Sequence, residues 1–402
     1  MPAGDVLTFK VAARYGADAI YIGGENFSLR AKAPNFTHTE MKECIAYAHM
    51  KNIKVYVTAN IYAHNDDLNA AKEYFNELNE IKPDGVLISD IGLLSIAKNI
   101  LSGIEIHLST QANTTNYEAV KFYRDLGVKR VVLARELSLA EIKKIKEEVS
   151  DTVELEAFVH GAMCISYSGR CLLSAFLTGR SANLGECTHP CRWKYMLLEE
   201  QERKGEYMPV METENGTYIF NSKDLNMIEH IDDLIETGID SLKIEGRMKT
   251  PLYIATVART YKKAINDYYT DKNFYRNNIE SYKKEISKCT YRDFTTGFYY
   301  GAPNEETQIY DNNTYVIGAT YYGVIEKVED GYLFFEQKNK FSVGDDIIIM
   351  KPNFDNVKAR VLEMYDAETN EKITSCPHSK QKIKIKIDAT AEELDVIRSN
   401  DS

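Results

Sequence analysis

Short apolar runs alternate with helical patterns along the first 250 residues, and this alternation constrains the fold more than any other feature. The apolar runs occupy residues 19–22, 53–58, 85–89, 105–108, 130–134, 153–159 and 241–244. Strands that alternate with helices in this way predict a parallel sheet covered by helices. The first strand is not followed by the Gly-x-Gly-x-x-Gly sequence of dinucleotide-binding sheets. The pattern therefore favours an α/β fold of the (β/α)8 TIM-like barrel type.

The N-terminus departs from this pattern. Residues 5–15 already read as a helix, yet no apolar run precedes them, and Met1-Pro2-Ala3-Gly4 resembles the turn that follows a strand. Either the barrel lacks its first strand, or the chain begins upstream of Met1.

Beyond residue 290 the apolar residues recur at every second position, with turn residues between the runs. This period predicts a small antiparallel β-barrel. We therefore expect two domains, a TIM-like barrel over residues 1–290 and a β-barrel domain over residues 291–402. Residues 195–220 read as a β-hairpin, which belongs to an insertion in the barrel at about residues 160–222.

Composition and charge describe an ordinary globular protein and narrow its partners. Of 402 residues, 44% are hydrophobic and 27% are charged, and no run approaches the roughly 20 apolar residues of a membrane span. We expect a cytoplasmic protein, where clustered cysteines bind metal more often than they form disulfides. The net charge of −11 argues against nucleic-acid binding by the whole surface, but it leaves room for a local basic patch.

Four of the seven cysteines lie close together at the end of the sixth apolar run. They are Cys164, Cys171, Cys187 and Cys191. Four thiolates suit an iron–sulfur cluster or zinc. Only the last two have the close spacing that is usual in structural zinc sites. The residues alone leave three interpretations open: a [4Fe–4S] cluster, zinc, and buried or redox-active thiols. His189 could replace one thiolate as a ligand.

Polar side chains recur where the predicted strands end, which in TIM-like barrels is the end that carries the chemistry. Together they predict one pocket whose arginines can bind an anion. Our candidate catalytic residues are Arg135, Glu136, His160 and Glu245. Our candidate substrate-binding residues are Arg30, His107, Gln111, Lys243 and Arg247.

The segment from residue 252 to residue 293 combines basic and aromatic side chains. It holds nine Lys or Arg and five Asp or Glu, a balance of +4, together with seven tyrosines. Basic groups interleaved with rings suit a surface that contacts a nucleic-acid backbone and stacks on its bases. The alternative is a solvated helix that covers the barrel with its tyrosines half buried.

At this point the sequence resembles a known family. The stretch Glu156-Ala-Phe-Val-His-Gly-Ala-Met-Cys164-Ile-Ser-Tyr-Ser-Gly-Arg-Cys171-Leu-Leu-Ser174 resembles the signature of the peptidase U32 family, the collagenase-like proteases. The blocks His107-Leu-Ser-Thr-Gln111 and Lys243-Ile-Glu-Gly-Arg247 support the resemblance. Length and motif order resemble most the tRNA hydroxylation branch of this family.

The resemblance implies a (β/α)8-like barrel with a [4Fe–4S] cluster on Cys164, Cys171, Cys187 and Cys191. It further implies prephenate-dependent conversion of a wobble uridine to 5-hydroxyuridine in tRNA, with the anticodon arm as partner. Prephenate, a dicarboxylate, would match the arginines of the predicted pocket. Proteolysis and hydroxylation of another RNA remain alternatives, and zinc remains the alternative metal. The sequence contains no His-Glu-x-x-His and no Gly-x-Ser-x-Gly motif, which weakens the case for proteolysis.

Overall fold

The computed structural model describes residues 1–28, 35–164, 166–190, 222–301 and 315–400. The predicted hairpin at residues 195–220 therefore lies outside the described residues. The chain divides into two compact units, and each unit is assembled from three separate segments. The first unit comprises Met1–Asp5, Ala19–Met248 and Tyr291–Val316, and the second comprises Val6–Asp18, Lys249–Thr290 and Ile317–Ser402. The predicted boundary at residue 290 stays a prediction.

The first unit is built on a mostly parallel sheet. Its parallel strands are β1 (Ala19–Gly23), β2 (Lys54–Ala59), β3 (Gly85–Ile88), β4 (Glu105–Leu108), β5 (Arg130–Val132), β6 (Glu154–Ala162) and β8 (Ser241–Ile244). They pair in chain order from β1 to β6, and β8 also pairs with β6. The end of β6 pairs antiparallel with β7 (Asp224–Asn226), which in turn pairs with β10 (Phe294–Thr295). The predicted parallel sheet is confirmed, whereas its closure into a barrel stays a prediction.

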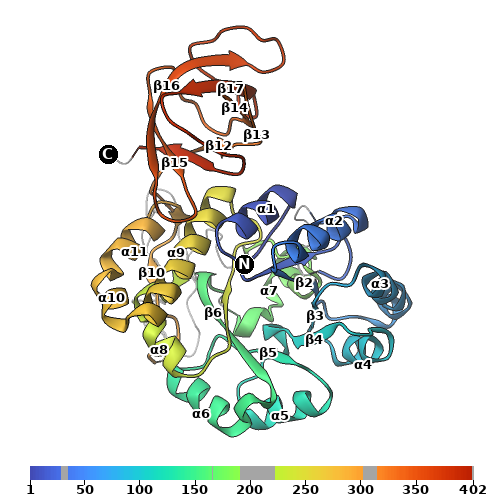
Figure 1. The fold of residues 1–402 in the computed structure, drawn as a ribbon. Coiled ribbons are helices and arrows are strands. Elements are labelled where there is room, and N and C mark those ends of the chain that lie inside the picture. Colours follow the sequence, from blue (N-terminus) through green and yellow to red (C-terminus); the bar gives the residue numbers. More distant parts are fainter. Residues whose placement is uncertain (29–34, 165, 191–221, 302–314, 401–402) are drawn as a thin grey trace, which may run out of the picture. The chain divides into compact units, whose positions relative to one another are not determined.

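Helices cover the outside of this sheet (Figure 1). They are α2 (His38–His49), α3 (Leu68–Ile81), α4 (Ile91–Ile100), α5 (Tyr117–Asp125), α6 (Leu139–Val149) and α8 (Ile231–Glu236). The capping boxes of α2 and α6 are both formed, with Thr37 and Ser138 accepting from the backbones of Glu40 and Glu141. These caps satisfy the first free amides of each helix and fix where it begins.

Residues 1–3 lie beside β1 at the edge of the sheet. Pro2 forms an isolated parallel bridge to Tyr21. The backbone amide of Tyr21 donates to the carbonyl of Met1 at 2.9 Å, and Ala3 donates back to Tyr21 at 3.1 Å. Among the described residues, no strand of the first unit precedes β1, as the sequence led us to expect. A short bridged segment stands in that place.

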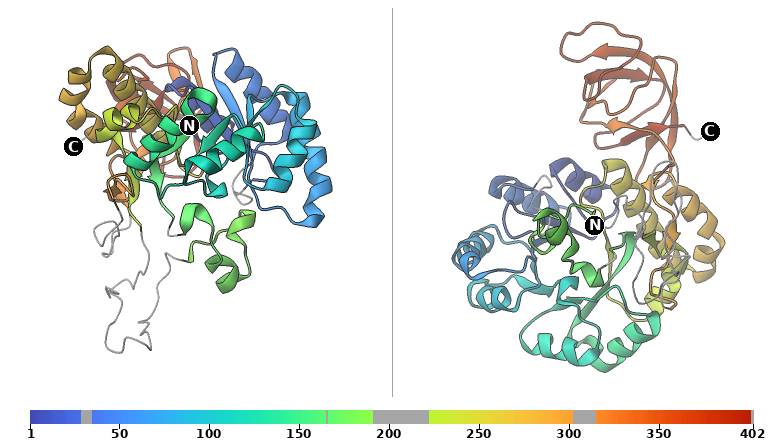
Figure 2. Two further views of the ribbon diagram at one scale, coloured as in Figure 1. Left: turned by 90° about the horizontal axis from the view of Figure 1, so that it is seen from below. Right: turned by 180° about the vertical axis from the view of Figure 1, so that it is seen from behind.

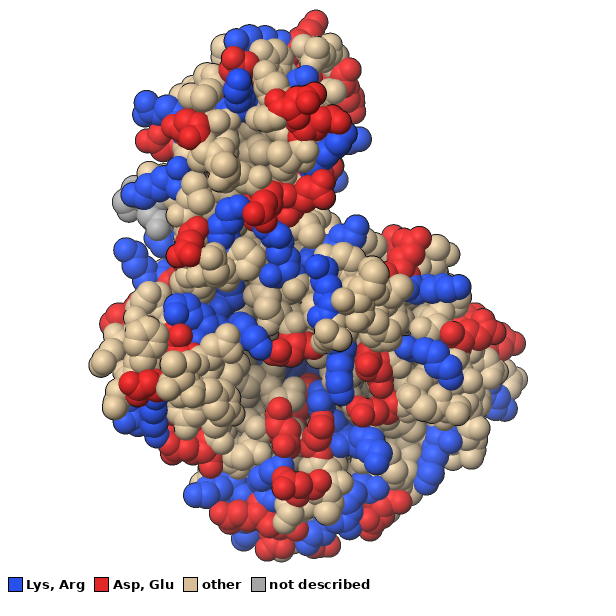
Figure 3. All heavy atoms as spheres, in the orientation of Figure 1, with Lys and Arg blue, Asp and Glu red and all other residues tan. Residues whose placement is uncertain are grey.

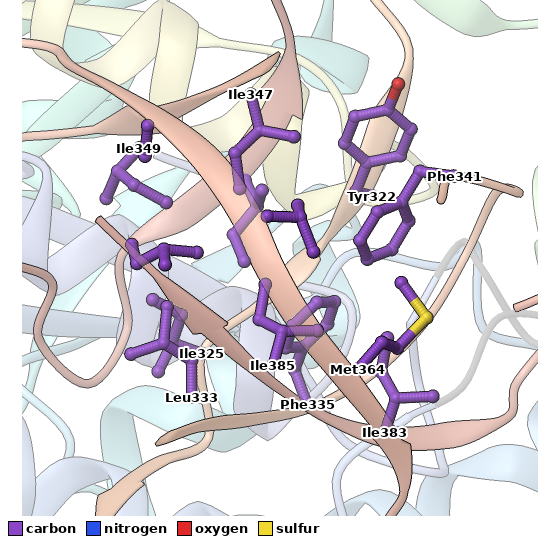
Figure 4. Close-up of a cluster of buried hydrophobic side chains, with 14 of the residues drawn as sticks. Tyr322, Ile325, Leu333, Phe335, Phe341, Ile347, Ile349, Met364, Ile383 and Ile385 are labelled. Carbon is purple, nitrogen blue, oxygen red and sulfur yellow. The ribbon is translucent and has the colours of Figure 1, made fainter. Parts of the chain in front are cut away.

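The second unit contains an antiparallel half-barrel. Its strands are β12 (Tyr321–Val324), β13 (Lys327–Glu329), β14 (Tyr332–Glu336), β15 (Asp346–Met350), β16 (Val357–Asp366), β17 (Lys382–Ile387) and β18 (Val396–Ser399). They pair in the order β12-β18-β15-β16-β17-β14-β13. Every second residue points inward, so that Leu333, Phe335, Ile383 and Ile385 pack into one apolar cluster (Figure 4). The period-two pattern therefore predicted this sheet correctly.

An N-terminal helix belongs to the same unit as these C-terminal strands. The hydroxyl of Tyr15, just after α1 (Val6–Arg14), donates to the Met350 carbonyl at 2.8 Å and accepts from the Val396 amide at 3.0 Å. Arg14 pairs with the fully buried carboxylate of Asp395 at 2.6 Å. Sequence periodicity reports only local structure, so it could not predict that the helix at residues 6–14 packs with strands near the C-terminus.

The basic, tyrosine-rich segment folds as α9 (Pro251–Thr270), α10 (Lys272–Asn277) and α11 (Ile279–Ile286). Four of its tyrosines are at most 3% exposed: Tyr253, Tyr261, Tyr275 and Tyr282. Tyr269, by contrast, is 72% exposed. The rings therefore serve mainly as core, which argues against a stacking surface along this segment. In the described part of the chain no helix, α9 included, combines the length and apolar character needed to cross a membrane.

Candidate functional site

A cavity of about 210 Å³ opens where the parallel strands of the first unit end. Strand residues such as Tyr21, Thr58 and Phe158 line it, together with loop residues that follow the strands. The segment that carries α7 (Leu173–Thr178) lies beyond this end of the sheet, as the two views of Figure 2 show. The candidate residues on the cavity wall are Gln111, Arg135, Cys164, Cys171, Cys187, His189, Lys243, Glu245 and Arg247.

A buried ion cluster lies beneath this wall. Glu156 of β6 accepts from Lys243 at 2.8 Å, from Ser241 at 2.8 Å and from Arg130 at 3.2 Å. Burial raises the pKa of Glu156, but the charges of Lys243 and Arg130 outweigh it and lower the pKa to about 2. Because Lys243 is already paired with this carboxylate, its charge is largely compensated within the protein.

Arg247 and Glu245 follow β8 and are held by β1. The guanidinium of Arg247 donates to Ser28 Oγ at 2.6 Å and to Asn35 Oδ1 at 2.8 Å. It lies directly against Gly23, where a Cβ atom would come within 2.4 Å of Arg247 Nη2. The Tyr21 hydroxyl lies 3.1 Å from Glu245 Oε2 and orients that carboxylate.

Arg135 and Gln111 approach the cavity from neighbouring strand ends. The Arg135 guanidinium lies over the Phe158 ring, 5.6 Å from its centroid, and its Nη1 donates to the Ala162 carbonyl at 3.4 Å. Gln111 belongs to the short helix η2 (Thr110–Ala112) that follows β4. Its backbone carbonyl accepts from Arg170 Nε at 3.0 Å and from the Tyr62 hydroxyl.

Three other predicted site residues lie off the cavity wall. Glu136 accepts from the backbone amide and the hydroxyl of Ser168, so it holds the loop behind the wall. His160 is 1% exposed and packs on Phe294, because β6 shifts register after Phe158 and turns the next side chains.

His107 is also 1% exposed and lies deeper in β4 than Ser109, which does line the cavity. It pairs with Glu105 at 2.9 Å, and burial lowers its pKa. Arg30 lies outside the described residues. The catalytic roles predicted for Glu136 and His160 stay predictions. The binding roles predicted for His107 and Arg30 do so as well.

Three of the four clustered cysteines meet at the cavity. Cys164, Cys171 and Cys187 all line it, and all three are half buried and outside any disulfide. The backbone amide of His189 donates to Cys187 Sγ at 3.4 Å. Cys191 lies outside the described residues, and within those residues no three Cys, His, Asp or Glu side chains converge as metal ligands. Three cysteines with soft sulfur donors line one cavity, which is the donor type that a cluster needs, and the cluster on all four cysteines stays a prediction.

Sequence reasoning missed several wall residues. Tyr21 and Phe158 line the cavity from strand interiors, where an aromatic residue is ordinarily core and gives no functional signal. Ser168 and Gly169 lie in the short helix η4 (Tyr167–Gly169) between two cysteines. The position of Gly169 between two of the clustered cysteines was the only sequence signal for these wall residues.

The chain matches the family described as Peptidase family U32 over residues 4–309 and the Peptidase family U32 C-terminal domain over residues 318–398. It belongs to peptidase family U32. It is 37% identical to tRNA hydroxylation protein P1 of Bacillus subtilis, over 96% of this chain and 91% of that protein. It is also 37% identical to tRNA hydroxylation protein P of Escherichia coli, over 87% of this chain and 85% of the relative.

Another relative carries a different name. The chain is 30% identical to a protein named Collagenase from Porphyromonas gingivalis, over 93% of this chain and 91% of that protein. Relatives of this chain are therefore named for two unrelated activities, tRNA hydroxylation and collagen cleavage.

Proposed function

We propose that this protein is an RNA-modifying enzyme that hydroxylates tRNA, converting a wobble uridine to 5-hydroxyuridine with prephenate as co-substrate. The similarity to two proteins named for tRNA hydroxylation extends over most of the chain and supports the reaction class. The cavity supports the proposal at the site, because thiols outside any disulfide and guanidinium groups line the same wall.

The four cysteines would hold a [4Fe–4S] cluster at this wall, with Cys191 completing the set. A cluster bound there would supply one-electron transfer. Cys164, Cys171 and Cys187 lie outside any disulfide, which supports this assignment, because a thiol already in a disulfide could not be a ligand. Zinc is the alternative ion, and the loose spacing of Cys164 and Cys171 argues against it.

The carboxylates of prephenate would bind at Arg247. Its guanidinium lines the cavity and donates to the neutral groups of Ser28 and Asn35, whereas Lys243 is matched by buried Glu156. A guanidinium on the cavity wall can bind a carboxylate through two parallel hydrogen bonds. The reaction would take place in the cytoplasm, in a (β/α)8-like barrel.

Nucleoside mass spectrometry of tRNA from a deletion strain tests the reaction. We expect 5-hydroxyuridine and its derivatives to disappear and to return with the wild-type gene. The variant Cys187→Ala should restore neither the nucleoside nor the brown colour of protein purified without oxygen. Cys44→Ala, which changes a buried cysteine of α2, should restore both. Unchanged 5-hydroxyuridine in the deletion strain would contradict the proposal.

A peptidase remains the second candidate, because the relative named Collagenase covers the same length. The same purified protein, incubated with collagen and gelatin, separates the two functions. Cleavage that survives removal of iron and ignores added tRNA would favour the peptidase.

A further inference from the structure

Gln111 and Arg135 line the cavity, and each holds a buried polar atom that no described residue satisfies. Gln111 is only 7% exposed, and within the described residues its Oε1 has no hydrogen-bond partner. The same holds for Nε of Arg135. Buried polar atoms are rarely left unpaired, because their desolvation goes uncompensated. Gln111 and Arg135 both line the cavity, so an unsatisfied acceptor and an unsatisfied donor in its wall indicate a ligand.

Arg135 is half buried and differs from three paired cations of the same unit. Arg130 pairs with Glu154, Arg292 pairs with Asp224 at 2.6 Å, and Lys243 pairs with Glu156 at 2.8 Å. Arg135 forms no ion pair with any described residue; its contacts are a carbonyl oxygen and the face of an aromatic ring. Its Nε–H group is positioned but donates to no described residue.

Gly169 brings the two groups to one place on the wall. A Cβ atom at Gly169 would lie 3.6 Å from Gln111 Nε2 and 4.0 Å from Arg135 Nη2. The two side chains therefore approach the same glycine. The backbone carbonyl of Gln111 accepts from Arg170 and Tyr62, which holds the backbone of this residue at the cavity wall.

We propose that Gln111 and Arg135 bind the amide edge of a pyrimidine base that enters the cavity from RNA. This inference rests on the proposed function and names the residues that select its base. The imide of uracil offers a proton at N3 beside an acceptor at O4, which matches the free Oε1 of Gln111 beside the free Nε–H of Arg135. A carboxylate offers only acceptors and would leave Gln111 unsatisfied.

The same pairing separates uracil from cytosine. Cytosine carries an acceptor at N3 and an amino donor at position 4, so it satisfies the two groups only when the ring is turned over, with its amino group at Gln111 and N3 at Arg135. Turning the ring over moves its C5 atom away from where the C5 atom of uracil lies when O4 pairs with Arg135. Pairing through O4 therefore also sets the position of the carbon to be modified.

The test measures binding of the full-length protein, purified without oxygen, to a fluorescent anticodon stem-loop. One RNA carries uridine at the wobble position and the other carries N3-methyluridine, which cannot donate from N3. We expect the wild-type protein to bind the methylated RNA about tenfold more weakly, the usual effect of losing a hydrogen bond to a buried group. Gln111→Ala should bind the two RNAs equally, since it removes the acceptor and makes room for the methyl group.

Two further variants keep the result interpretable. Gln111→Met is close in size and should also lose discrimination, which guards against a folding defect in the alanine variant. Gln337→Ala removes an equally buried glutamine from the second unit, where its Nε2 donates to Cys376 at 2.9 Å, and it should keep the wild-type preference.

The outcomes separate this inference from the proposed function. If the wild-type protein binds both RNAs equally, or if Gln111→Ala still discriminates tenfold, the role of Gln111 is refuted while RNA binding stands. If neither RNA binds at all, the proposed function fails and this inference fails with it.

Discussion

One carboxylate, Glu156, joins three strands of the first unit. It lies on β6 and pairs with Arg130 of β5 and with Lys243 and Ser241 of β8. Removing one partner of a buried ion pair leaves an uncompensated charge, which costs far more than loss of a surface pair.

We predict that Glu156→Gln lowers the free energy of unfolding by about 3 kcal/mol. The matched change is Glu154→Gln, because Glu154 also pairs with Arg130 but its side chain is 50% exposed. That variant should lose no more than about 1 kcal/mol. Urea unfolding followed by circular dichroism measures both, and equal losses would show that burial of Glu156 does not matter.

The same residue predicts a pH dependence. Burial raises the pKa of Glu156, and the two cations lower it further than burial raises it, to about 2 from the ordinary value of 4.5. The unfolded chain therefore binds the proton first, so stability from Glu156 is complete above pH 4.5 and is lost as pH falls toward 2. Unfolding free energies measured across this window should fall less steeply in Glu156→Gln than in the wild type.

The C-terminal end of β6 determines how closely the strands at the cavity wall approach one another. The strand shifts register after Phe158, and Gly161 then adopts a φ of +112° with no room for a side chain. A Cβ atom there would lie 2.5 Å from the carbonyl oxygen of Glu245. Two strands can therefore approach closely only because residue 161 is glycine.

We predict that Gly161→Ala destabilises the protein by about 1 to 3 kcal/mol more than Gly103→Ala. Gly103 also has a positive φ, +71°, but a Cβ atom there would meet nothing within 4 Å. Both variants therefore carry the cost of an unfavourable backbone, and their difference measures the clash. Thermal melting in parallel gives the comparison; indistinguishable melting temperatures would mean that β8 can move aside.

Sequence reasoning found elements whose signal is local. The predicted strands at residues 105–108 and 241–244 coincide with β4 and β8, and the caps of α2 and α6 form as expected. It missed β7 and β10, because two or three residues are too short to show a period. It also could not place His160, whose direction depends on an irregularity in β6 rather than on alternation.

At the scale of the whole molecule, charge is mixed rather than separated. Acidic and basic side chains are interspersed over the face shown in Figure 3, and the chain carries a net charge of −11. An acidic protein that binds RNA must do so through a limited set of cations.

We therefore predict that affinity for the anticodon stem-loop falls steeply with salt. Each neutralised phosphate contributes a slope of about −0.7 to −0.9 in a plot of log affinity against log salt concentration. Anisotropy titrations from low to physiological salt give the number of phosphates bound. A slope near zero would rule out the backbone contacts that binding of the stem-loop requires.

The assembly of the second unit from both ends of the chain has a consequence for its synthesis. Arg14 and its buried partner Asp395 are 381 residues apart. At ordinary bacterial translation speeds the ribosome needs on the order of 20 to 80 s to travel between them. During that interval α1 lacks the strands that bury it, so a helix that is synthesised early can complete its packing only late.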